Sequence, residues 1–332
     1  MKTCALYGFT PKLEPFAGLT PTGQVALLQS WGNTAIFGGY RDPAFVEAAH
    51  AAGMKIYAEF GCFAGKTWWE QFPASRPVTE DGRPLPAQDW YYGVNPTTPQ
   101  VRQRRLEALE TLLTRYQVDG VWLDYIRWPC HWEVPAPYLP RTSFDPATLT
   151  RFAQTLSDDA LVDSLPGAGA AAVSRYESEW VNWRCRQITS WVSKARDIRD
   201  RVRPGAVLGL FGVPWRLSDY DGAILEIVGQ DYRALGQYVD LFSPMVYHKM
   251  CNFPVDWIAQ VAQEVHTLTG KPVWPIIQSV DQPVALSAQE YGQALDVALN
   301  CSASDGVLVF TLQGALGDGK LAVTRAGFGR GK

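Results

Sequence analysis

Metal-binding histidine patterns are absent from this sequence. It has only four histidines in 332 residues, and they form neither an HxH nor an HExxH pattern. Those spacings place two imidazoles on one metal ion, so their absence argues against a metal-dependent barrel hydrolase. The six cysteines include no CxxC pair, which argues against a zinc or dithiol redox motif, although pairing between loops stays open. We therefore expect no metal site and no cofactor.

An excess of one charge and a long apolar run are also lacking. The net charge is -3 and the pI is near 5.9, which gives no reason to expect nucleic acid or an anionic membrane as a partner. No apolar run approaches the roughly 20 residues that a membrane span needs. No signal peptide precedes residues 3–9, which already have the pattern of a strand. The compartment stays open, because a signal could have been removed.

Short apolar segments alternate with helical periodicities along the whole chain. Alternating strands and helices favour a parallel sheet with right-handed crossovers, and eight strands close a (β/α)8 barrel. We therefore predict an α/β fold, a single (β/α)8 TIM-barrel domain over residues 1–332. The eight expected strands are 3–9, 33–38, 55–60, 120–125, 206–212, 240–247, 273–278 and 306–312. The helical patterns include 43–52, 99–116, 177–202, 254–268 and 287–300.

Two long segments interrupt this alternation. Residues 61–97 follow the third expected strand and residues 129–176 follow the fourth, and both are rich in proline. Since both follow the C-terminal end of a strand, we expect them on the catalytic face, where they would wall a cleft. Flat aromatic rings suit the faces of sugars, although ordinary packing of long loops is the competing interpretation. The aromatic residues in expected loops are Trp68, Trp69, Trp90, Tyr91, Tyr92, Trp128, Trp132 and Trp215.

The segment from Asp119 to Pro129, DGVWLDYIRWP, has the pattern of a buried strand that ends in a carboxylate. Its apolar centre is typical of a parallel strand covered by helices on both faces. Alternation along a strand places Trp122 and Asp124 on one face. If that face is the barrel interior, Asp124 lies above a tryptophan layer at the C-terminal end, where barrels carry their chemistry.

The DGVWLDYIRWP segment resembles the strand-4 motif of bacterial glycoside-hydrolase-like TIM barrels. A second match runs from Gly229-Gln230-Asp231-Tyr232 to Ser243-Pro244-Met245-Val246-Tyr247, which is similar to the GQD helix opening and SPMxY strand of that group. The matches span most of the chain in the same order. The resemblance implies a barrel glycoside hydrolase that cleaves a polysaccharide in a cleft at the C-terminal face, and the two long aromatic loops favour internal cleavage.

Glycoside cleavage generally uses two carboxyl groups that flank the bond. Asp124 is the expected nucleophile or base, and it resembles the strand-4 nucleophile of α-galactosidase-like barrels. Its alternative role is a structural carboxylate paired with Arg127. Chitinase-like barrels carry their acid at the position of Ile126, so their substrate-assisted mechanism is not supported.

The proton donor is harder to assign from the sequence. Glu59 ends the third strand, beside Asp124 in a barrel, where burial would raise its pKa. Asp231 belongs to the resemblance, but it could instead cap a helix over 231–238. Other carboxylates left open are Glu177, Glu179 and Asp281.

Further polar and aromatic side chains are expected to contact the sugar, and a polysaccharide or oligosaccharide is the expected partner. The alternative function is a non-catalytic carbohydrate-binding barrel that has lost its second catalytic carboxylate. A second carboxylate near Asp124 would discriminate between the two. A phosphosugar enzyme is a third possibility, but no clustered basic phosphate site supports it. The expected substrate-binding residues are Tyr7, Arg127, Trp128, Trp215, Tyr247, His248, Gln278 and Asp281.

Overall fold

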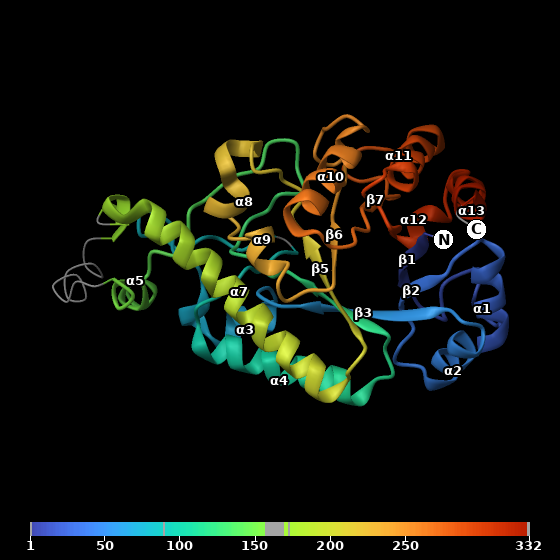
Figure 1. The fold of residues 1–332 in the computed structure, drawn as a ribbon, viewed down its shortest axis with the longest axis horizontal. Coiled ribbons are helices and arrows are strands. Elements are labelled where there is room, and N and C mark those ends of the chain that lie inside the picture. The colour runs from blue at the N-terminus through green and yellow to red at the C-terminus, as the bar shows by residue number, and fades with distance from the viewer. Residues whose placement is uncertain (1, 89, 157–168, 172, 331–332) are drawn as a thin grey trace.

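The computed structural model describes residues 2–88, 90–156, 169–171 and 173–330, and its eight strands form one parallel sheet (Figure 1). The strand order is β6-β5-β4-β3-β2-β1-β8-β7. A parallel bridge between Phe242 and Val273 joins the two ends of the sheet, so the barrel is nearly closed. The strands are β1 (Thr3–Phe9), β2 (Ala35–Gly38), β3 (Lys55–Gly61), β4 (Gly120–Asp124), β5 (Val207–Gly212), β6 (Leu241–Pro244), β7 (Ile276–Gln278) and β8 (Gly306–Phe310).

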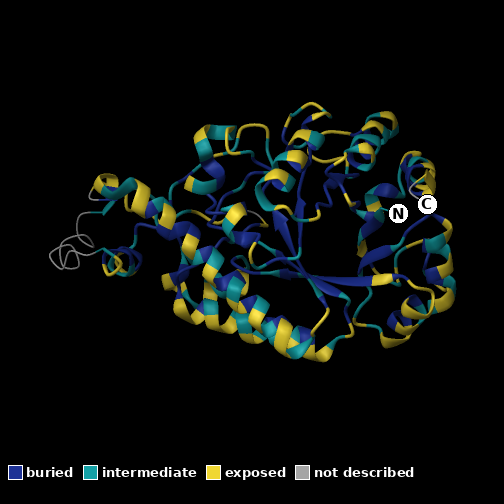
Figure 2. Cartoon of the chain, viewed as in Figure 1, coloured by how far each residue is buried: buried dark blue, intermediate teal, exposed yellow. Residues whose placement is uncertain are grey.

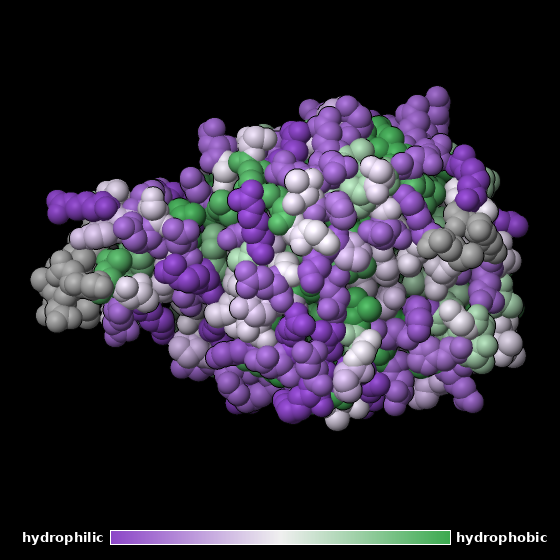
Figure 3. Space-filling view, viewed as in Figure 1, coloured by the Kyte–Doolittle hydropathy of each residue, from purple (hydrophilic) through white to green (hydrophobic). Residues whose placement is uncertain are grey.

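Helices surround the sheet and turn their exposed residues outward (Figure 2). The face of the molecule in Figure 3 is mostly hydrophilic, with small apolar patches. None of the described helices combines the length and apolarity needed to cross a membrane. The helices are α1 (Pro21–Ser30), α2 (Pro43–Ala51), α3 (Lys66–Gln71), α4 (Pro99–Arg115), α5 (Pro146–Ala153), α7 (Glu177–Val202), α8 (Ala223–Glu226), α9 (Tyr232–Leu235), α10 (Trp257–Thr269), α11 (Ala288–Asn300), α12 (Leu312–Ala315) and α13 (Lys320–Arg330).

Local sequence explains where several helices begin. Proline occupies the first turn of α1, α2, α4 and α5, where its missing N–H costs no helical hydrogen bond. Asp42 caps α2 by accepting from the backbone N–H groups of Ala44 and Phe45. The eight parallel strands confirm the predicted (β/α)8 barrel, although β6 ends at Pro244 instead of 247 and β7 begins at Ile276 instead of 273. The predicted helix 231–238 is shorter, and α9 spans only Tyr232–Leu235.

The barrel interior is packed with aromatic side chains. Trp122 stacks on Trp274 with ring centroids 5.5 Å apart, and it also contacts Phe37 and Tyr57 at 4.9 and 4.7 Å. Its indole N–H donates to the Ser243 hydroxyl over 3.0 Å. Because Trp122 fills the interior, alternation along β4 brings the next inward side chain to the C-terminal mouth of the barrel.

Candidate active site

A cavity of about 510 Å³ opens at the C-terminal ends of the strands. Its volume falls within the range of small-molecule binding sites. Residues of β1, β3, β4 and β8 line its floor, and segments that follow β3, β4, β6 and β7 supply the rest. The lining residues are Tyr7, Glu59, Trp90, Asp124, Tyr125, His131, Glu133, Val134, Met245, Tyr247, Met250, Gln282, Pro283 and Phe310.

Two carboxyl groups come from neighbouring strands of this floor. Glu59 on β3 is paired in register with Trp122, and Asp124 lies two residues further along β4. Strand spacing and rise place the two Cα atoms about 8 Å apart. The Tyr7 hydroxyl donates to Glu59 Oε2, and the backbone N–H of Tyr125 donates to Asp124 Oδ1 over 2.7 Å. The barrel therefore brings two of the three expected catalytic carboxyl groups, Glu59 and Asp124, to one cavity.

The environment favours a proton on Asp124. Burial raises the pKa of Asp124 well above its ordinary value, and the nearby negative charge of Glu59 raises it further, while Arg127 opposes both effects. The pKa of Tyr7 is also raised, by burial first and then by Glu59. Tyr7 therefore remains a neutral phenol and a hydrogen-bond donor to Glu59.

The backbone turns sharply after Asp124. Tyr125 has a φ of +49°, a left-handed conformation that costs a bulky residue of the order of 1 kcal/mol. Arg127 is buried beneath the turn, with its guanidinium 5.0 Å from the ring of Tyr125 and 5.4 Å from that of Tyr91. These contacts hold the turn that aims Asp124 into the cavity. Such strain is common at functional sites.

Glu133 is a lining residue that sequence reasoning missed. It lies in the segment after β4 and is only 18% exposed. Its Oε2 atom is buried and accepts no hydrogen bond within the described part of the chain. Burial raises the pKa of Glu133, although Arg127 opposes the rise. The available signal was its position, nine residues beyond Asp124 and next to the aromatic Trp132.

Two of the expected substrate-binding residues line the cavity, and the others do not. Tyr7 and Tyr247 are on its surface, with their rings 5.1 and 5.2 Å from that of Phe310. Asp231 is outside the lining and caps α9, where it accepts from the backbone N–H groups of Arg233 and Ala234. The other residues outside the lining are Arg127, Trp128, Trp215, His248, Gln278 and Asp281.

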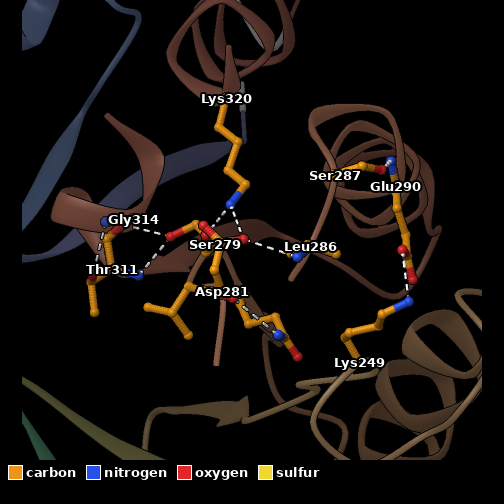
Figure 4. Close-up of polar contacts among 11 residues, drawn as sticks. Lys249, Ser279, Asp281, Leu286, Ser287, Glu290, Thr311, Gly314 and Lys320 are labelled. Carbon is orange, nitrogen blue, oxygen red and sulfur yellow. Dashed lines mark hydrogen bonds and ion pairs between the residues drawn. The ribbon is translucent and has the colours of Figure 1, made fainter. Parts of the chain in front are cut away.

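Burial explains most of these placements. Trp128 donates its indole N–H to the carbonyl of Arg184 over 3.1 Å, and Trp215 packs against Tyr220. His248 is 1% exposed and its Nε2 lies 3.3 Å from Glu290. Gln278 is also buried and accepts from the backbone N–H of Met250, and the residue before Met250, Lys249, pairs with Glu290 (Figure 4).

Asp281 shapes the cavity indirectly. The buried Lys320 donates to Asp281 over 2.7 Å and to the Ser279 carbonyl over 2.9 Å, as Figure 4 shows. The backbone N–H of Leu286 donates to the same carboxylate. These bonds fix the segment after β7, which presents Gln282 and Pro283 to the cavity.

Replacing Asp124 by asparagine is expected to stabilise the fold near neutral pH. In the unfolded chain this carboxyl group loses its proton near pH 3.9, whereas in the folded chain it keeps the proton to higher pH. The free energy of unfolding of wild type should therefore fall, relative to that of the variant, as pH rises from about 3.9 to the raised pKa of folded Asp124. Thermal unfolding followed by circular dichroism at about pH 4 and about pH 7 checks this. If the difference in unfolding temperature between the two proteins does not widen as pH rises, the pKa of Asp124 is not raised in the folded chain.

The described residues hold no group of three or more histidine, cysteine, aspartate and glutamate side chains placed to bind a metal ion. All six cysteines are free thiols, and five of them are buried. The pairing that the sequence left open therefore does not occur. Burial raises the pKa of Cys130 to about 12, so this thiol stays protonated.

Comparisons with known proteins support the fold and no closer relationship. No protein-family model and no curated protein sequence matches the chain. The glycoside hydrolase domain of PgaB (BpsB) from Bordetella bronchiseptica is similar in structure, with a TM-score of 0.68, 12% identity and 98% of both chains covered.

Longer enzymes share the same architecture. A β-galactosidase from the Antarctic haloarchaeon Halorubrum lacusprofundi has a TM-score of 0.68 at 11% identity, covering 99% of this chain and 58% of that one. α-L-Fucosidase isoenzyme 2 from Paenibacillus thiaminolyticus has a TM-score of 0.63 at 12% identity, covering 99% and 49%. The chain spans about half the length of these two enzymes. At such identities the similarity establishes the fold, a (β/α)8 barrel of the kind that these glycoside hydrolases share.

Proposed function

We propose that this protein is a glycoside hydrolase in which Asp124 is the proton donor and Glu59 is the nucleophile or general base. The observation that carries the proposal is that the two carboxyl groups line one cavity at the C-terminal mouth of the barrel. Their environments also differ, since burial favours a proton on Asp124 and the Tyr7 hydroxyl donates to Glu59. One protonated and one ionised carboxyl group is the combination that glycoside cleavage requires.

The reaction follows from these two states. Asp124 transfers its proton to the glycosidic oxygen, and the electrons of the breaking C–O bond leave with that oxygen. Glu59 either attacks the anomeric carbon, as in retaining enzymes, or takes a proton from the attacking water, as in inverting enzymes. When Glu59 attacks, water later releases the sugar and returns a proton to Asp124. Either route passes through an oxocarbenium-like transition state, which the negative charge of Glu59 stabilises.

These roles reverse the assignment that the sequence suggested. A strand-4 aspartate resembles a nucleophile, and a buried glutamate on β3 resembles an acid. Burial raises the pKa of Asp124, and the Tyr7 hydroxyl donates a hydrogen bond to Glu59. An acid must hold its proton at the working pH, so the raised pKa favours Asp124 as the donor.

The alternative of a non-catalytic carbohydrate-binding barrel is less well supported. That alternative required the loss of a second carboxyl group near Asp124, whereas Glu59 lines the same cavity. The aromatic rings of Trp90, Tyr125 and Tyr247 supply apolar surfaces that suit sugar faces in either case. The glycoside hydrolases with the same fold add an argument from architecture alone.

Release of reducing ends from a panel of bacterial and plant polysaccharides and oligosaccharides tests this proposal. Wild type should release them from at least one glycan, and Asp124→Asn and Glu59→Gln should not. Asp231→Asn is the matched control, because Asp231 lies outside the cavity and asparagine also caps helices well. Activity that survives in both cavity variants would refute the catalytic assignment. Glycan binding without release by wild type would favour the non-catalytic alternative.

A further inference from the structure

One wall of the cavity comes from segments outside the barrel strands. Trp90 lies in the segment after β3, and His131 and Glu133 lie in the segment after β4. We call these three residues the loop wall. The catalytic pair proposed above belongs to β3 and β4 themselves, so the loop wall is a separate part of the same cavity.

Trp90 is unusual among the tryptophans of this chain. It is 54% exposed, whereas seven other tryptophans are among the largest fully buried side chains. Its ring meets that of His131 edge-on, with centroids 5.4 Å apart and planes at 89°. An exposed indole at the edge of a cavity offers a flat apolar face, which suits the C–H face of a sugar ring.

His131 and Glu133 place two polar atoms of the cavity lining at a separation that one hydroxyl group can bridge. His131 Nε2 is 4.0 Å from Glu133 Oε2, too far for a hydrogen bond between them. For a hydroxyl oxygen placed about 2.8 Å from each of these two atoms, the angle between its two hydrogen bonds would be about 90°, which is acceptable. Glu133 Oε2 has no other partner, and a buried polar atom without one is costly.

The packing of Trp132, the residue before Glu133, fixes the position of Glu133. Trp132 is fully buried and stacks on Tyr247, with centroids 5.7 Å apart and planes at 21°. Burial raises the pKa of Glu133 and lowers that of His131, and Arg127 contributes to the lowering. Burial thus shifts each side chain towards its uncharged form, and no lysine or arginine lines the cavity as described. This environment suits a neutral sugar hydroxyl.

We infer that the loop wall is a binding subsite for a second, uncharged sugar residue, stacked on Trp90 and hydrogen-bonded by its hydroxyl to His131 and Glu133. The inference rests on the proposed function for its claim that this sugar adjoins the one whose bond is cleaved. The substrate is then an oligosaccharide or polysaccharide, rather than a single sugar on a small leaving group.

Binding of short neutral oligosaccharides to Asp124→Asn, measured by titration calorimetry, tests the subsite without turnover. Adding Trp90→Ala to this variant should weaken binding about tenfold or more, and adding Glu133→Leu should also weaken it, by about fivefold. Tyr138→Ala is the matched control, since Tyr138 is an exposed aromatic residue that does not line this cavity. Unchanged affinity in the Trp90 and Glu133 variants, or no oligosaccharide binding at all, would overturn the inference.

Glycosyl fluorides separate this inference from the proposed function. Their leaving group is one atom, so it leaves the loop wall empty. Trp90→Ala in the active protein should lower kcat/KM for an oligosaccharide about tenfold or more and change that for the fluoride less than about threefold. Equal losses on both substrates would contradict the subsite while leaving hydrolysis established. A wild type that binds oligosaccharides through Trp90 but cleaves neither substrate would instead refute the hydrolase and keep the subsite.

Discussion

Asp124→Asn is expected to slow cleavage of an unactivated glycosidic bond by about 10²–10⁴-fold and to spare a dinitrophenyl glycoside. Dinitrophenolate leaves without a proton, so the loss of a proton donor has little effect on it. Glu59→Gln should instead slow both substrates severely, because each needs a negative charge or an activated water at the anomeric carbon. Measured kcat/KM values for the two substrate types in each variant therefore assign the two roles.

Added azide sharpens the same assignment. A small anion can occupy the space of a removed carboxylate side chain, so azide should restore turnover of an activated glycoside in Glu59→Ala. The opposite pattern, with leaving-group dependence in Glu59→Gln and uniform loss in Asp124→Asn, would restore the roles that the sequence suggested. Asp231→Asn should match wild type on both substrates, because its carboxylate caps α9 outside the cavity.

The barrel could be predicted from the sequence because its signals are local. Each strand is a short apolar run, and proline or a capping residue marks the start of several helices. Glu59 and Asp124 lie near the ends of neighbouring strands, so the topology alone brings them to one mouth. The helix-capping role of Asp231 was also predictable, since aspartate before a helix commonly caps it.

The cavity walls depend on contacts between distant segments, which alternation along the chain does not reveal. Glu133 reaches the cavity because Trp132 packs on Tyr247, more than a hundred residues further along the chain. Trp128 and Trp215 belong to expected loops, and both are buried in the core. Sequence identifies an aromatic loop residue, whereas only the packing decides whether its ring faces a cavity or fills the interior.

The surroundings of Asp124 and Glu59 also depend on tertiary contacts. Asp124 and Glu59 have similar ordinary pKa values, so their residue types do not say which one holds a proton. Burial in the folded barrel raises the pKa of Asp124, and β1 brings the Tyr7 hydroxyl to Glu59 from 52 residues away. The roles that we propose for Asp124 and Glu59 therefore rest on contacts that form only when the barrel closes.

Gly209→Ala is expected to lower the free energy of unfolding by about 3 kcal/mol, through overpacking of the barrel interior. Gly209 on β5 is paired in register with Trp122 on β4. A Cβ atom at this position would lie 2.2 Å from the indole ring of Trp122. The indole cannot easily retreat, because it stacks on Trp274 and donates to Ser243. Thermal or urea unfolding, followed by circular dichroism, measures the loss.

Gly329→Ala is the matched control, since the residue lies in α13 and a Cβ atom there meets nothing within 4 Å beyond its neighbours and the backbone of its own helix. Its effect should stay within about 0.5 kcal/mol or stabilise the helix. Adding Trp122→Phe to Gly209→Ala should recover part of the lost stability, because the smaller ring vacates the space that the new methyl group needs. A Gly209→Ala variant as stable as Gly329→Ala would mean that Trp122 does not pack against β5. The inward orientation of β4, and with it the placement of Asp124 in the cavity, would then be in doubt.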